Sequence, residues 1–232
     1  MTLMMGSTSW QSPRDPAQAT AHPNAPFRER QVSSLGVTDR GLVEAIRAGH
    51  SHAAAPLYDS LRPSIEQALQ RVLRDRPPEF EDLMQITFER VIRTIAEGHF
   101  EGRSQLKTWA SAIAAHVAVD WLRRRTQEQR LFEAVDFNAI DPQAYGVLPE
   151  RQLEARSEVR KIHGILGRMK PRRATILVLH DVMGHSVPQV AELLGINISA
   201  AQSRLRRARQ EFLRRYTTSV SSRTVSETES SG

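Results

Sequence analysis

Apolar residues recur every three or four positions over two long stretches of the chain, residues 39–130 and residues 154–216. That period is typical of amphipathic helices, which bury one face against a core. Aromatic residues make up only 6% of the chain, so the core must be mainly aliphatic, which suits packed helices better than a β-sandwich. The pattern therefore predicts an all-α protein built from two small helical domains.

Turn residues divide the first stretch into several predicted helices. Gly49 and Pro63 are expected to mark breaks or helix starts, and the Arg-Pro-Pro sequence at 76–78 cannot continue a helix. A further helix is predicted from Glu79, because acidic residues occupy its first turn, and Gly98 is expected to end it. The first stretch thus predicts a helical bundle.

The second stretch has the turn and cap residues of a helix-turn-helix. Pro171 can begin a helix and Gly184 can end it, and Ser186 and Gln189 then have the spacing of a capping box. Gly195 allows a tight turn before a second short helix, which is predicted to start near residue 199. In this motif the N-terminal residues of the second helix enter the major groove of duplex DNA. A basic helical hairpin that binds protein is the alternative.

Composition separates the two helical blocks from the segments around them. Pro, Ser, Gln, Ala and Asn are frequent in residues 7–30, and Ser, Thr and Glu dominate residues 217–232, so both ends are predicted to be disordered. Residues 133–149 have little helical period and contain Asp, Asn, Pro and Gly, which predicts a flexible linker. The expected organisation is a disordered extension at 1–37, a bundle at 38–132, a linker at 133–153, a helix-turn-helix domain at 154–216 and a disordered tail at 217–232.

The charge of the chain is unevenly distributed. The whole chain has 32 Lys and Arg residues against 26 Asp and Glu, a net charge of +6. Residues 160–216 contain 12 basic and 3 acidic side chains, a net charge of +9, whereas residues 133–158 contain 2 and 6, a net charge of −4. The basic block predicts an anionic partner, and the linker before it is predicted to be acidic.

Cysteine is absent, which excludes a disulfide framework, thiolate zinc sites and cysteine nucleophiles. No apolar run is long enough to predict a membrane-spanning helix, and the first ten residues lack the pattern of a secretory signal. We therefore expect a cytoplasmic protein without membrane insertion.

Two groups of residues are candidates for chemistry. In residues 100–109, cations at Arg103 and Lys107 precede Trp109, a combination that favours binding of unpaired nucleic acid, although the ring can equally be a core residue. His180 and Asp181 lie close to a further histidine, but without a clear third ligand they make a poor metal site. A nucleic-acid enzyme is therefore disfavoured, and no catalytic residue, metal or cofactor is predicted.

Five segments together resemble a known family. FEDLMQITFERV at 80–91, FEGRSQLKTW at 100–109 and IAAHVAVDWLRRR at 113–125 resemble region two of bacterial sigma factors of the extracytoplasmic-function group. SVPQVAELLG at 186–195 and SRLRRAR at 203–209 resemble region four of that group. The resemblance covers residues 38–216 in the family's order, with a linker in place of region three. It implies a dissociable promoter-specificity subunit of RNA polymerase that catalyses no reaction itself.

The resemblance also implies a role for each segment. The helix at 80–91 matches the surface that docks on core RNA polymerase, through Asp82, Leu83, Gln85, Phe88 and Glu89. The loop and helix that follow match the part that melts and reads the minus-ten element as a single strand, through Arg103, Ser104, Lys107, Trp109, His116, Arg123 and Arg124. The last helix matches the reader of the minus-thirty-five duplex, through Arg172, Ser199, Ala200, Gln202, Ser203, Arg204, Arg206 and Arg207.

The chain departs from the family's pattern in two places. His116 stands where the family commonly has an asparagine that captures a flipped base, and Ala-Ala-Gln at 200–202 replaces the usual Thr-Val-Lys. Core RNA polymerase and promoter DNA are the implied partners, with an anti-sigma factor as a candidate third. The alternative function is a stand-alone helix-turn-helix regulator, which would bind duplex DNA without polymerase and would leave the segments at 80–91 and 100–109 unexplained.

Overall fold

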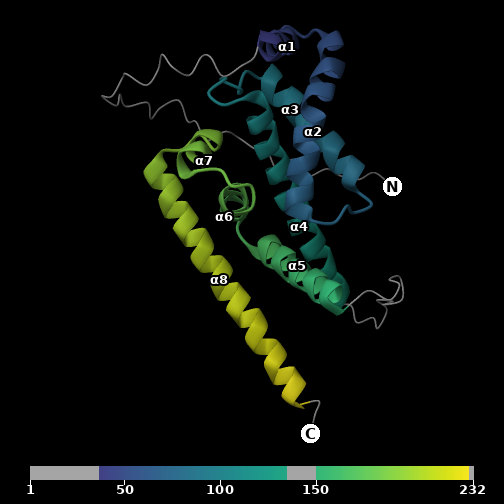
Figure 1. Cartoon of the computed structure of the whole chain (residues 1–232), viewed down its shortest axis with the longest axis vertical. Helices are drawn as coiled ribbons and strands as arrows, with labels where there is room; N and C mark the ends of the chain where they lie inside the picture. The colour runs from purple at the N-terminus through teal and green to yellow at the C-terminus, as the bar shows by residue number, and fades with distance from the viewer. Residues whose placement is uncertain (1–36, 135–149, 230–232) are drawn as a thin grey trace.

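The computed structural model describes residues 37–134 and 150–229 of the chain (Figure 1). Every regular element in these ranges is helical, which confirms the predicted fold class. The predicted N-terminal extension up to residue 36 and the linker residues 135–149 lie outside the described residues. None of the helices in the described ranges is long and apolar enough to cross a membrane.

Four helices form the N-terminal bundle. They are α1 (Val37–Arg47), α2 (Ala54–Leu73), α3 (Phe80–Ala96) and α4 (Leu106–Ala134), and a short 3₁₀ turn at Ser51–Ala53 joins the first two. Helix α4 packs against both α2 and α3. The apolar stripe of α2 is completely buried in this core, at Leu57, Leu61, Ile65 and Leu69.

One predicted break in the bundle is wrong. Pro63 lies inside α2 instead of interrupting it. Proline removes the hydrogen bond to the carbonyl of Asp59, but both residues are on the exposed face, where water can satisfy that carbonyl. The buried stripe continues on both sides and holds the helix together. Gly98, by contrast, ends α3 as predicted, with a φ of 78° and an amide that donates to the carbonyl of Ile95.

The C-terminal domain contains the predicted helix-turn-helix. Helix α5 (Glu150–Arg168) precedes α6 (Pro171–Leu177), which continues into a π-helical turn at Val178–Val182, and α7 (Val187–Leu193) and α8 (Ile198–Glu229) follow. Both hydrogen bonds of the predicted capping box between Ser186 and Gln189 are present at the start of α7. The turn before α8 contains Gly195 with a φ of 62°, and the side chain of Asn197 caps α8 by accepting from the amide of Ala200 at 2.7 Å.

The last helix is much longer than the sequence pattern predicts. Helix α8 continues to Glu229 and extends past the rest of the molecule in Figure 1. It therefore includes most of the segment 217–232 that composition predicts to be disordered. No glycine or proline occurs between Ile198 and Glu229, so no residue stops the helix once its first turns are packed.

The two domains are packed against each other. Helices α5 and α6 of the C-terminal domain both pack against α4 of the bundle. A single cluster of buried apolar residues runs through both domains. In Figure 1, α6 lies between α8 and the bundle. We refer to the contact of α5, α6 and α7 with the bundle as the domain seam.

Candidate nucleic-acid interface

The exposed side of α8 is strongly basic. Arg206 and Arg207 are exposed, and Arg204 is half-buried beside Arg172 from the start of α6. Burial lowers the pKa of Arg204, and the nearby charges of Arg172 and Arg207 lower it further. Within the described ranges no carboxylate forms an ion pair with any of these four arginines. Like charges held this close are stabilised when an anion such as a phosphate group lies between them.

The other predicted contacts of α8 occupy the same side of the helix. Ser199 and Gln202 are exposed, and Ala200 and Ser203 are half-buried. Leu205 and Ala208 are buried against the rest of the domain, which fixes which face of α8 points outward. The structure therefore brings together all eight residues that the sequence predicts for duplex binding.

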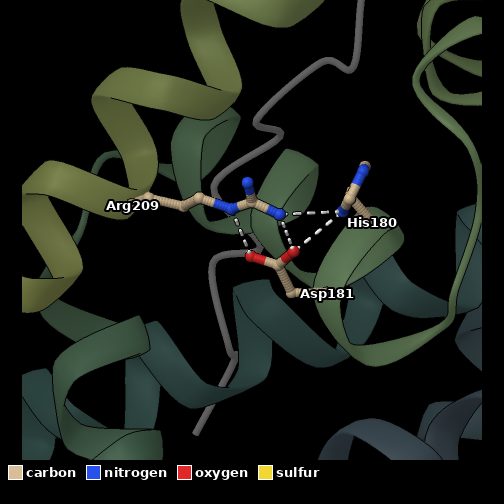
Figure 2. Close-up of polar contacts among 3 residues, drawn as sticks. All are labelled: His180, Asp181 and Arg209. Carbon is tan, nitrogen blue, oxygen red and sulfur yellow. Dashed lines mark hydrogen bonds and ion pairs between the residues drawn. The ribbon is translucent and has the colours of Figure 1, made fainter.

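Two ion-pair clusters hold α8 on α6. On one flank, Arg209 donates to both carboxylate oxygens of Asp181 in the π-helical turn, with a distance of 3.0 Å from Nε to Oδ2 (Figure 2). Nδ1 of His180 lies 2.8 Å from Oδ1 of that carboxylate. On the other flank, the buried carboxylate of Glu211 accepts from Arg173 at 2.6 Å and from Arg215 at 3.1 Å. Helix α6 supplies the cation Arg173 on one flank, and the π-helical turn that continues it supplies the acid Asp181 on the other.

The Asp181 cluster bears on which arginines of α8 are free to bind DNA and on whether the chain holds a metal ion. Hydrogen bonds from Arg209 hold the pKa of Asp181 below its ordinary value, so the carboxylate stays charged and its partner stays neutralised. Arg209 is therefore unlike Arg204, Arg206 and Arg207 of the same helix, because its charge is already paired. Among the described residues, no group of three or more His, Asp or Glu side chains could hold a metal ion.

The predicted polymerase surface on α3 is mostly exposed. Asp82, Gln85 and Glu89 face outward, with Gln85 donating to Glu89 at 2.9 Å, and Phe88 is half-buried against Tyr58. Leu83 requires a correction, because its side chain is only 2% exposed. It belongs to the core of the bundle and holds α3 in place, so it cannot itself contact a partner.

The loop before α4 has exposed cations and a buried aromatic anchor. Arg47 on α1 donates to the carbonyl of Phe100, whose ring packs on Trp109 with a centroid separation of 4.7 Å. Arg103 and Lys107 are exposed, and Arg103 pairs with the neighbouring Glu101.

Trp109 itself is not available for stacking in this conformation. Its side chain is only 7% exposed, so its ring cannot stack on an unpaired base in this structure, contrary to the prediction from the sequence. The remaining predicted contacts of this region divide by exposure: Ser104 and Arg123 are half-buried, and Arg124 is exposed.

His116 lies under the C-terminal domain. Its Nδ1 shares a hydrogen bond with the hydroxyl of Thr175 at 3.2 Å, and its Nε2 lies 3.5 Å from the carboxylate of Asp120. Burial lowers the pKa of His116; Asp120 opposes that shift, and the charges of Arg90 and Arg123 add to it. No sequence pattern predicts the contact with Thr175, because the two residues are far apart in the chain and share no motif.

Acidification is expected to destabilise the protein through His116. The folded protein holds the pKa of this histidine below its ordinary value of 6.5, so the unfolded chain binds more protons around that pH. The stabilisation is therefore present above pH 6.5 and is lost as the pH falls from 6.5 through the lower pKa of the folded protein. Urea unfolding between about pH 8 and pH 5 should show the loss, and a His116→Gln variant should show less of it. Identical pH profiles for the two proteins would contradict the assignment.

Two small cavities line the domain seam. One lies between the loop before α4 and the end of α7, and the other lies between α3, α4 and α6, and each has a volume of about 50 Å³. Trp109, Leu193 and Leu194 line both. Cavities of this size have room for a few water molecules but not for a nucleotide.

A bundle with a cationic loop, joined to a helix-turn-helix whose second helix presents arginines without a carboxylate partner in the described ranges, is the arrangement of a DNA-binding protein. Comparison with known proteins identifies which kind. Sigma-70 region 2 matches residues 57–128 and Sigma-70, region 4 matches residues 160–212, together more than half of the chain. Both matches fall inside the two domains predicted from the sequence.

Two individual relatives agree with these matches. The chain is 30% identical over 148 residues to the ECF RNA polymerase sigma factor SigX of Bacillus subtilis, covering 63% of this chain and 75% of SigX. It is 30% identical over 138 residues to the RNA polymerase sigma factor YlaC of the same organism, covering 60% of this chain and 78% of YlaC. A solved structure of CnrH in complex with the cytosolic domain of CnrY aligns with a TM-score of 0.42 and 20% identity, covering 75% of this chain and 94% of that chain.

The chain belongs to the sigma-70 family of RNA polymerase sigma factors, in the extracytoplasmic-function group. It binds RNA polymerase and DNA and directs the polymerase to promoters, and it is not an enzyme. This membership decides against the stand-alone helix-turn-helix regulator.

Proposed function

We propose that the promoter is read by two surfaces of this chain, the basic side of α8 for the minus-thirty-five duplex and the loop and face of α4 for the unpaired minus-ten strand. The arginine cluster of Arg172, Arg204 and Arg207 supports the assignment of α8 to the duplex. These cations have no acidic partner within the described ranges. Arg204 and Arg207 lie in the N-terminal half of α8, and Arg172 lies beside them at the start of α6. Phosphate contacts there position the duplex, and Gln202 and Arg206 are placed to reach base edges.

The second assignment rests on the loop before α4. Arg103 and Lys107 are exposed and can follow the phosphates of a strand, while Trp109 and His116 lie on the adjoining face of α4. His116 can donate or accept a hydrogen bond through either ring nitrogen, so it can hold a flipped base in place of the family's asparagine.

The third surface is the exposed side of α3, where Asp82, Gln85 and Glu89 are proposed to dock on core polymerase with the edge of Phe88. Because polymerase is the partner, we place the chain in the cytoplasm. An anti-sigma factor remains a predicted further partner, on the strength of the family resemblance alone.

Transcription in a purified system tests the proposal. Core polymerase with the full chain should produce discrete transcripts from fragments of the source genome, and those start sites should share a motif at the minus-ten and minus-thirty-five positions. The double variant Arg103→Ala, Lys107→Ala should still bind duplex DNA but should yield far less transcript. If the full chain adds no start sites to those of polymerase alone, or if the double variant transcribes as well as the wild type, the proposal fails.

A further inference from the structure

The buried face of the recognition helix α8 is smooth. In the half of the helix that is proposed to read DNA, the buried apolar residues are Ala201, Leu205 and Ala208. Two of these three carry only a methyl group, so the face has shallow ridges for a neighbouring helix to grip. A roll of about 20° would move a side-chain atom that lies about 6 Å from the helix axis by about 2 Å, which is enough to break a hydrogen bond to a base edge. Contacts at the flanks of α8 are therefore in a position to set its orientation.

The two ion-pair clusters lie on opposite flanks of this buried face. Arg209 and Glu211 are two positions apart in α8, so they point about 200° apart around the helix axis, on either side of Ala208. Asp181 holds the first flank and Arg173 holds the second. Loss of one cluster would leave α8 held by ion pairs from one side only, and the helix would be free to roll toward the other.

Each cluster lies in line with a different part of the proposed DNA surface. Gln202 precedes Arg209 by seven residues, which is about two helical turns, so the two side chains share one side of α8 about 10 Å apart along the axis. By the same spacing, Arg204 shares the side of Glu211. The Asp181 cluster therefore lies in line with a side chain that is proposed to read a base, and the Glu211 cluster with one that is proposed to hold a phosphate group.

The acid of the first cluster is held by an unusual turn. In the π-helical turn at Val178–Val182, the amide of Met183 donates to the carbonyl of Val178 at 2.9 Å, five positions back. Such a turn holds one residue more than an ordinary helical turn, which re-aims the side chains it carries, and it occurs frequently at functional sites. His180 holds the carboxylate of Asp181 from the side opposite the chain of Arg209, with Nδ1 placed 2.8 Å from Oδ1 to donate to it (Figure 2). Asp181 is thus fixed by its own turn and can orient Arg209.

We infer that Asp181 is a positioning residue for base recognition: by holding Arg209 it fixes the orientation of α8 in which Gln202 meets a base edge. The inference rests on the proposed function, because it takes the duplex-reading role of α8 as given. Asp181 acts through Arg209 and does not itself contact DNA. Its loss should blur the choice of base while it spares the phosphate contacts on the other flank, which is the opposite of what loss of a phosphate-binding cation does.

Selection from a library of DNA duplexes with a randomised central segment tests the inference. The free full chain suffices, because the outer face of α8 is exposed. Sequencing of the bound duplexes gives the base preference at each position, and the position read by Gln202 is the one whose preference Gln202→Ala abolishes. The wild type should prefer one base there by about fivefold or more. Asp181→Ala and Arg209→Ala should each remove most of that preference, and the double variant should lose no more than either single variant.

Arg214 provides the control on the same helix. It is exposed and lies outside both clusters, so Arg214→Ala should keep the wild-type base preference even if its affinity changes. Asp181 and Arg209 are also exposed, and an exposed ion pair adds little to stability, so their variants are expected to fold. Circular dichroism checks this. If Asp181→Ala does not fold, Asp181→Asn takes its place, because it keeps the shape of the side chain but cannot accept both hydrogen bonds of the guanidinium, and it should lose the preference as well.

Three results would overturn the inference. The folded Asp181 variant could keep the wild-type preference at the Gln202 position. Arg209→Ala alone could lose that preference, which would mean that Arg209 reads the base itself. The Asp181 variant could weaken the preference equally at every position, which would indicate a general loosening of the domain. Failure of the proposed function looks different, because the wild-type chain would then enrich no sequence at all, and the inference would fall with it.

Discussion

Replacing Trp109 with alanine is expected to lower the free energy of unfolding by about 3–5 kcal/mol, the usual cost of removing a large aromatic side chain from a core. The ring is only 7% exposed and packs on Phe100, which is itself 2% exposed. Its removal would leave a void between the loop before α4 and the end of α7. Urea unfolding followed by circular dichroism measures the loss.

Trp121 offers the control, because it is on the same helix but half-buried, with the guanidinium of Arg125 over its ring at 5.1 Å. Trp121→Ala should cost much less than Trp109→Ala. Equal losses for the two variants would mean that Trp109 is exposed in solution, as expected of a free base-stacking residue. Trp109→Phe should retain most of the stability, which allows strand binding to be examined without loss of the fold.

The parts of the fold that depend on local sequence could be predicted well. The capping box of Ser186 and Gln189, the left-handed glycines at Gly98 and Gly195, and the buried stripe of α2 each depend on residues within a few positions of one another. The break predicted at Pro63 is wrong because the residue type alone does not show that this position lies on the exposed face of a helix.

The contacts between the two domains could not be predicted in this way. His116 and Thr175 belong to different domains, and Gly167 is required only because a Cβ atom there would lie 2.2 Å from Oγ1 of Thr126 on α4. A glycine within a helix has several possible explanations, and only the packing shows which one applies. The sequence pattern therefore pointed to Trp109 and His116 as candidates for strand binding, but it could not show that Trp109 is buried or that His116 contacts the C-terminal domain.

The double variant Arg204→Ala, Arg207→Ala is expected to bind duplex DNA at least about 100-fold more weakly, since each lost charge-assisted contact to phosphate costs about 1.5–3 kcal/mol. The same change should alter the salt dependence. A plot of the logarithm of affinity against the logarithm of salt concentration should become shallower by about 0.9 for each phosphate contact removed. Fluorescence anisotropy with one fixed duplex, between about 50 and 200 mM salt, measures both quantities.

Arg209 provides a control of the same residue type on the same helix. Its guanidinium is already bound to both oxygens of Asp181, so Arg209→Ala should leave the salt slope unchanged even if it loosens α8 on α6. Conversely, Asp181→Ala releases this cation and should make the slope steeper, by at most about one phosphate contact. If Arg209→Ala flattens the slope as much as Arg204→Ala does, then pairing with a carboxylate does not decide which arginines of α8 bind DNA. The distinction between the two kinds of arginine would then have to be abandoned, and the duplex-binding surface would extend along the helix to Arg209.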